Sequence, residues 1–161
     1  MRPAPDAKDF RRELSSLLPR LRRFALTLTR DGGEADALVE EVCNRAIGQP
    51  GGWDGRGRLD GWIFALARAV HGEKPPAWRE ALAALAQGGQ GTEGPGSEIR
   101  ALILALPDTY ASVFLLVDVE RYSYTEAAAV LDLAPEQVAK TLCAARLRLA
   151  NMTAASSMRR A

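Results

Sequence analysis

Residues 123–149 read SYTEAAAVLDLAPEQVAKTLCAARLRL, and this stretch decides the fold of the last third of the chain. Ser123 followed by Glu126 fits a capping box, in which each side chain accepts a hydrogen bond from the other residue's backbone N–H at the start of a helix. Residues 132–134 form a tight turn, and Pro135 suits the first position of the next helix. The apolar stripe of that helix consists of Val138, Leu142, Ala145 and Leu149. The pattern predicts a helix-turn-helix, whose second helix can enter a major groove; the alternative is a plain helical hairpin without a nucleic-acid role.

The residues before this motif predict the centre of the same domain. VFLLV at 113–117 is apolar on every face, which is typical of a helix buried at the middle of a domain. Pro107 opens this predicted helix, and an apolar stripe beginning at Ile99 precedes it. Helical periodicity is lost after the motif, which puts the order of residues 150–161 in doubt. We therefore place this domain at 98–152.

Three further apolar stripes at helical spacing predict a first domain at 1–73. They cover 10–28, 35–47 and 59–70, and a Gly-rich loop, GQPGGWDGRGR, separates the last two at 48–58. Pro19 interrupts the first stripe and is expected to bend or break the helix near Leu18. The sequence Asp31-Gly32-Gly33 is expected to end that helix.

Residues 74–97 differ in composition from both flanking blocks. Gly, Pro and Ser dominate their second half, which is typical of a flexible linker, and a short helix is expected near 78–86. The predicted fold class is therefore all-α, with a three-helix bundle and a helix-turn-helix domain on either side of this linker.

Charge and composition limit the function. The chain has 21 basic and 20 acidic residues, so its net charge is only +1. This net charge is low for a protein that mainly binds DNA by neutralising phosphates. No apolar run approaches the roughly 20 residues needed to cross a bilayer, and the N-terminus is too charged for a secretion signal. We expect no membrane insertion and a cytoplasmic location.

No residue pattern predicts a cofactor, a metal site or catalysis. Cys43 and Cys143 lie far apart, each within an apolar stripe, so both are expected to be small core side chains. His71, the single histidine, has no second ligand near it in the sequence. We therefore do not expect an enzyme.

The two helical blocks together resemble the extracytoplasmic-function class of bacterial sigma factors. ALILALPDTYASVFLLVDVERYSYTEAAAVLDLAPEQVAKTLCAARLRL resembles that family's region 4, which binds the upstream promoter box. LLPRLRRFALTLTRDGGEADALVEEVCNRAI, followed by GRLDGWIFALARA, resembles region 2, which docks on RNA polymerase and captures an unstacked promoter strand. The resemblance implies a transcription initiation factor whose partners are core RNA polymerase, promoter DNA and an anti-sigma factor.

The resemblance also implies three sets of site residues. The RNA polymerase-docking set is Asp36, Leu38, Val39, Glu41 and Arg45. The strand-capturing set, for the downstream promoter element, is Trp53, Arg56, Arg58, Trp62 and Arg68. The upstream promoter set is Gln137, Lys140, Thr141, Arg146 and Arg148. Flipped bases need an aromatic platform and cations near their phosphates, although the position of Trp62 on the apolar stripe favours a core role.

Both DNA-facing surfaces depart from the family pattern. Where the family has Thr-Val-Lys-Ser-Arg, this chain has Gln-Val-Ala-Lys-Thr at 137–141, and a further basic position is Ala144. The helix is expected to begin at Ala134, which offers no side-chain cap. In the first block, the family's asparagine is replaced by Ala69. Two hypotheses remain open: a working sigma factor, or a sigma-like decoy that binds an anti-sigma factor without productive promoter recognition, as in stress-response regulators.

Overall fold

The computed structural model describes residues 6–49, 52–55, 57–73 and 97–160, and within these ranges the regular structure is entirely helical. The chain divides into two compact units, Met1–Gln90 and Gly91–Ala161. The predicted all-α class is confirmed. The short helix predicted near 78–86 and the predicted linker up to residue 96 lie outside the described residues. Ser97, the last residue of the predicted linker, begins the first described helix of the second unit.

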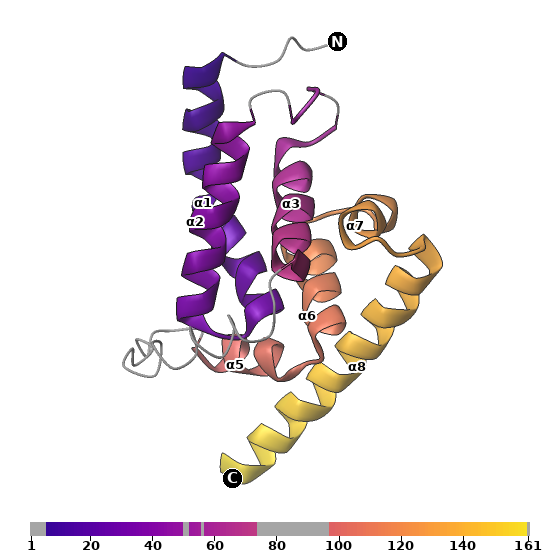
Figure 1. The fold of residues 1–161 in the computed structure, drawn as a ribbon. Helices are drawn as coiled ribbons and strands as arrows, with labels where there is room; N and C mark the ends of the chain where they lie inside the picture. Colours follow the sequence, from indigo (N-terminus) through magenta and orange to yellow (C-terminus); the bar gives the residue numbers. More distant parts are fainter. Residues whose placement is uncertain (1–5, 50–51, 56, 74–96, 161) are drawn as a thin grey trace. The chain divides into compact units, whose positions relative to one another are not determined.

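Three helices pack against one another in the described part of the first unit: α1 (Ala7–Thr29), α2 (Gly32–Gly48) and α3 (Leu59–Glu73) (Figure 1). Phe24 of α1 stacks on Phe64 of α3 with the ring centroids 4.9 Å apart. Both rings are fully buried. Other fully buried side chains from the three helices are Leu21, Leu38, Val42, Ile63 and Val70. This core is the predicted meeting of the three apolar stripes.

The boundary between α1 and α2 differs from the prediction. α1 runs unbroken through Pro19, although proline lacks the N–H of a helical hydrogen bond. Buried Leu14 and Leu21 hold the helix against the core on both sides of this position. Tertiary packing therefore outweighs the local cost, so of the predicted bend or break the break does not occur.

The predicted stop at 31–33 belongs instead to the start of α2. α1 ends at Thr29, and Arg30 adopts a left-handed conformation with φ 62°. Asp31 then caps α2, because its side chain accepts a hydrogen bond of 2.9 Å from the backbone N–H of Glu34. The two glycines form the first turn of α2.

The second unit contains the predicted helix-turn-helix. Its helices are α5 (Ser97–Ala105), α6 (Asp108–Phe114), α7 (Tyr124–Leu131) and α8 (Pro135–Arg160), with one π-helical turn, η1 (Leu115–Val119), continuing α6. Val113, Leu115 and Leu116 are buried, as predicted for the centre of this domain. The capping box of Ser123 and Glu126 is present, and α7 packs on α8.

The structure corrects two predictions: the uncertain order of residues 150–161 and the core positions of the two cysteines. α8 continues as a helix to Arg160, although its periodicity is lost after residue 150. Neither cysteine is a core side chain, since Cys43 is half-buried and Cys143 is exposed. Burial raises the pKa of the Cys43 thiol.

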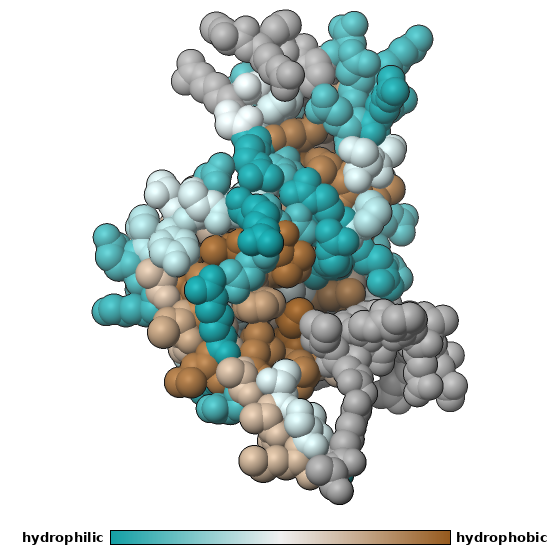
Figure 2. Space-filling view, turned by 180° about the vertical axis from the view of Figure 1, so that it is seen from behind, coloured by the Kyte–Doolittle hydropathy of each residue, from teal (hydrophilic) through white to brown (hydrophobic). Residues whose placement is uncertain are grey.

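The surface of the described residues carries both hydrophilic and hydrophobic side chains. Figure 2 shows hydrophilic and hydrophobic side chains together on the face that it draws. Leu147 and Met158 of α8 are among the exposed large hydrophobic residues, at 63% and 81% of their full exposure. No helix in the described ranges is both long enough and apolar enough to span a membrane.

Candidate nucleic-acid and polymerase interfaces

The predicted polymerase-docking residues lie on α2, where the charged ones are already paired within the unit. Asp36 is exposed and accepts a hydrogen bond of 2.6 Å from Nε of Arg22. This bond to Asp36 raises the pKa of the Arg22 guanidinium. Arg45 donates to Glu41 one turn earlier, at 2.9 Å, and to Glu73 at the end of α3, at 2.6 Å.

Leu38 does not belong to this surface. It is only 1% exposed and sits in the core of the first unit. Its inclusion in the docking set is corrected, because a buried side chain anchors the helix and presents nothing to a partner. Val39, the next residue, is half-buried and remains at the surface of α2.

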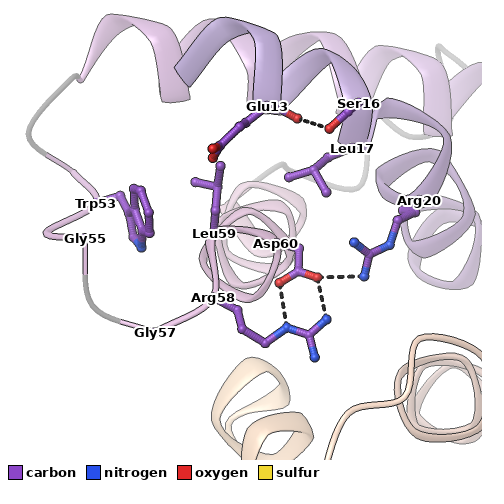
Figure 3. Close-up of a pocket in the computed structure, with 10 residues that line it drawn as sticks. All are labelled: Glu13, Ser16, Leu17, Arg20, Trp53, Gly55, Gly57, Arg58, Leu59 and Asp60. Atoms are coloured by element: carbon purple, nitrogen blue, oxygen red, sulfur yellow. Dashed lines mark hydrogen bonds and ion pairs between the residues drawn. The ribbon is translucent and has the colours of Figure 1, made fainter. Parts of the chain in front are cut away.

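A cavity of about 390 Å³ opens between α1 and the loop that leads into α3 (Figure 3). The α1 wall consists of Glu13, Ser16, Leu17 and Arg20. The opposite wall consists chiefly of Trp53, Arg58, Leu59 and Asp60. We call this cavity the loop pocket. It brings together two of the predicted strand-capturing residues, Trp53 and Arg58.

Asp60 connects the two walls of the loop pocket. Its carboxylate accepts hydrogen bonds from Nε and Nη2 of Arg58, at 3.0 and 2.7 Å, and from Nη2 of Arg20, at 2.6 Å. The backbone N–H of Gly61 donates a further bond of 2.9 Å to the same carboxylate. Asp60 is 6% exposed, and a carboxylate removed from water this far needs such partners. Figure 3 shows the two guanidinium groups converging on this one carboxylate.

Two other strand-capturing residues, Trp62 and Arg68, are not part of the wall of the loop pocket. Trp62 is half-buried and meets the ring of Phe10 edge-on, with centroids 6.4 Å apart. A Cβ atom added at Gly52 would lie 2.9 Å from the Trp62 ring, so the loop backbone passes directly over this indole. Arg68 is exposed on α3, and Arg56 lies outside the described residues.

Three of the five predicted upstream promoter residues hold α8 in place. The side-chain oxygen of Gln137 accepts a hydrogen bond of 3.0 Å from the backbone N–H of Ala134, so Gln137 supplies one helix-start bond from inside the helix. Arg146 donates two hydrogen bonds to the carboxylate of Asp118 in η1, one of them 2.9 Å long. The guanidinium of Arg148 lies over the ring of Tyr110 in α6, 5.2 Å from its centroid.

The other two residues of the upstream set face outward to different degrees. Lys140 is exposed and Thr141 is half-buried. The sequence did not predict Arg20, Asp60 or Asp118 as site residues, although each pairs with a predicted site residue or with that residue's partner. Arg20 and Asp60 are 40 positions apart, and no local pattern connects them.

Two family models match the chain, one in each unit. The model described as Sigma-70, region 4, matches residues 97–149, and the model described as the Sigma2 domain of PhyR matches residues 14–74. The chain belongs to the sigma-70 family, within the extracytoplasmic-function type. It is therefore a sigma factor, a class of transcription factors and not of enzymes.

Similar proteins agree with this assignment. This sigma factor is 27% identical over 154 residues to the ECF RNA polymerase sigma factor EcfG of Rhodopseudomonas palustris (strain TIE-1), covering 90% of this chain and 85% of that protein. Its fold matches the sigma factor RpoE of Bartonella quintana, solved with the anti-sigma factor NepR, with a TM-score of 0.74, 22% identity, and coverage of 91% and 97% of the two chains. It also matches CnrH, solved with the cytosolic domain of CnrY, with a TM-score of 0.61, 21% identity and 92% coverage of each chain.

Proposed function

We propose that this sigma factor directs transcription initiation: α2 docks on core RNA polymerase, the loop pocket captures an unstacked base of the promoter strand, and α8 meets the upstream promoter element. The observation that carries the proposal is the loop pocket, which places an aromatic ring and a guanidinium at one opening. Proteins that hold single strands combine these two groups, because bases stack on aromatic rings and arginine adds cation–π contacts. Such a factor would act in the cytoplasm, where core RNA polymerase is found.

The surface of α2 supports docking by an exchange of partners. The side chains of Asp36, Glu41 and Arg45 are each at least 37% exposed, and all three are paired within the unit. Exposed ion pairs contribute about 0–1 kcal/mol each. Exchanging these ion pairs for pairs with charges on the polymerase therefore costs little free energy. Val39, on the same helix, would add an apolar contact with the polymerase.

The surface of α8 supports a weak upstream contact. Gln137, Arg146 and Arg148 each make a contact within the second unit. Lys140 is exposed, and its charge is the one that we expect to contact a phosphate. One phosphate contact contributes about 0.9 to the salt slope of duplex binding. We therefore propose that polymerase docking and strand capture supply most of the affinity for a promoter.

An anti-sigma factor is the partner that would regulate this chain. RpoE of Bartonella quintana, whose fold this chain shares, was solved in complex with one. We propose that a comparable inhibitor covers α2 and α8, the surfaces assigned above to polymerase and DNA.

The proposal is tested by transcription with purified core RNA polymerase. The sigma factor is added to core enzyme and to a template library randomised upstream of the start site, and transcripts are sequenced to find the promoters that were used. We expect co-elution with core enzyme and transcripts from a defined subset of templates. Val39→Asp should abolish both, whereas Asn151→Asp, on the exposed end of α8, should change neither. Failure of the wild-type chain to bind core enzyme would overturn the proposal in favour of the decoy function.

A further inference from the structure

We propose that Asp60 is the positioning residue of the loop pocket: it fixes the guanidinium of Arg58 so that the pocket selects a base and not a phosphate. This inference rests on the proposed function, because it concerns how the strand-capturing pocket distinguishes its ligand.

The geometry around Asp60 sets the orientation of Arg58. Nε and Nη2 of Arg58 both bond to Asp60, at 3.0 and 2.7 Å, one to each carboxylate oxygen. Two parallel bonds of this kind fix the plane of a guanidinium as well as its place. Arg20 in turn holds the same carboxylate from α1, so the loop side and the helix side of the pocket are tied together (Figure 3).

The charges on the described lining of the loop pocket cancel. Glu13 and Asp60 oppose Arg20 and Arg58, and no other described lining residue is charged. Phosphate binding depends on an excess of cations, and the described lining has none. An uncharged base suits it better: it can stack beside Trp53 and meet a guanidinium whose plane is already set.

Removal of the Asp60 charge should therefore have two opposite effects on strand binding. Asp60→Asn keeps the size of the side chain but makes the charge of the pocket more positive by one. The released Arg58 can then move toward the backbone of the strand, which raises general affinity and increases the salt slope by up to about 0.7 for single-stranded DNA. At the same time, discrimination between bases is lost because the guanidinium is no longer oriented. A merely structural role of Asp60 would reduce the folded fraction and change neither the salt slope nor the discrimination of the folded protein.

The experiment uses the full chain with core RNA polymerase and a pre-opened bubble DNA whose sequence comes from the transcription selection above. Each base of the exposed strand is replaced in turn by an abasic site, and dissociation constants are measured at several salt concentrations. For the wild type, loss of the captured base should weaken binding about 5- to 150-fold, as expected for loss of base stacking. For Asp60→Asn we expect a smaller abasic penalty than in the wild type at that position, because Arg58 is no longer oriented while Trp53 still stacks on the base, together with a steeper salt slope. Asp54→Asn, in the same loop but outside the pocket wall, is the matched control and should retain the wild-type penalty.

Arg58→Lys provides a second variant in case Asp60→Asn does not fold. Lysine keeps the charge but lacks the planar fork, so the abasic penalty should fall while the salt slope stays at the wild-type value. Full retention of the abasic penalty in the folded variants would overturn the assignment of Asp60, while a penalty in the wild type would leave the proposed function intact. If the wild type selects no promoter at all, the proposed function is wrong and this inference falls with it.

Discussion

Replacement of Leu38 by alanine tests whether this residue is a docking residue or a core residue. Leu38 is 1% exposed within the first unit. Truncation of a leucine buried to this degree costs about 2–5 kcal/mol, from the lost transfer of apolar atoms and the cavity left behind. For a domain of this size, each kcal/mol lowers the melting temperature by about 4–8 °C, so we expect a fall of at least about 8 °C. Val39→Ala, at the half-buried neighbouring position, is the matched control and should cost about 1 kcal/mol or less.

Tryptophan fluorescence follows this unfolding in the first unit. Trp62 packs edge-on against Phe10 and reports on the unit, and a Trp78→Phe background removes the tryptophan of residues 74–96. Binding to core RNA polymerase is then measured at a temperature where both variants are folded, and Leu38→Ala should bind as the wild type does. A melting curve that overlays the wild type, together with lost polymerase binding, would place Leu38 on the docking surface and refute the reasoning.

Three further predictions concern α8, the loop and the thiols. Lys140→Gln should reduce the salt slope of upstream duplex binding by about 0.9, whereas Arg146→Gln should lower affinity and leave the slope unchanged; a reduced slope for Arg146→Gln would mean that this guanidinium contacts a phosphate. Gly52→Ala should blue-shift or quench the indole emission and weaken bubble DNA binding, because its Cβ would lie 2.9 Å from the indole ring, while Gly48→Ala, which has open space around it, should change neither. Because burial raises the pKa of the Cys43 thiol, less thiolate is present at a given pH, and its alkylation profile should lie at higher pH in the native protein than in urea. Coincident profiles by site-resolved mass spectrometry would contradict this.

The helix-turn-helix was predictable almost residue by residue because its signals are local. The capping box at 123–126 and the proline at 135 act within one helical turn, and the structure has both where the sequence predicts them. At Pro19 the same reasoning allowed a break that does not occur, because packing of the flanking leucines keeps the helix continuous. Local rules hold where no tertiary contact competes with them.

The candidate sites were less predictable because their contacts are not local. Asp60 pairs with Arg20 across 40 positions, and Arg146 pairs with Asp118 across 28. A sequence pattern shows that an arginine is present on a helix but not which carboxylate it meets. The extension of α8 through residues 150–160 was missed for another reason, since an exposed helix needs no apolar periodicity.

The unequal exposure of the two thiols makes α8 a natural attachment point for a probe. Cys143 lies exposed on α8, whereas Cys43 is half-buried with a raised pKa. A maleimide dye added near neutral pH would therefore be carried mainly by α8 without any engineered residue. Its emission would then report, in real time and on single molecules, when this helix approaches DNA or is covered by an inhibitor.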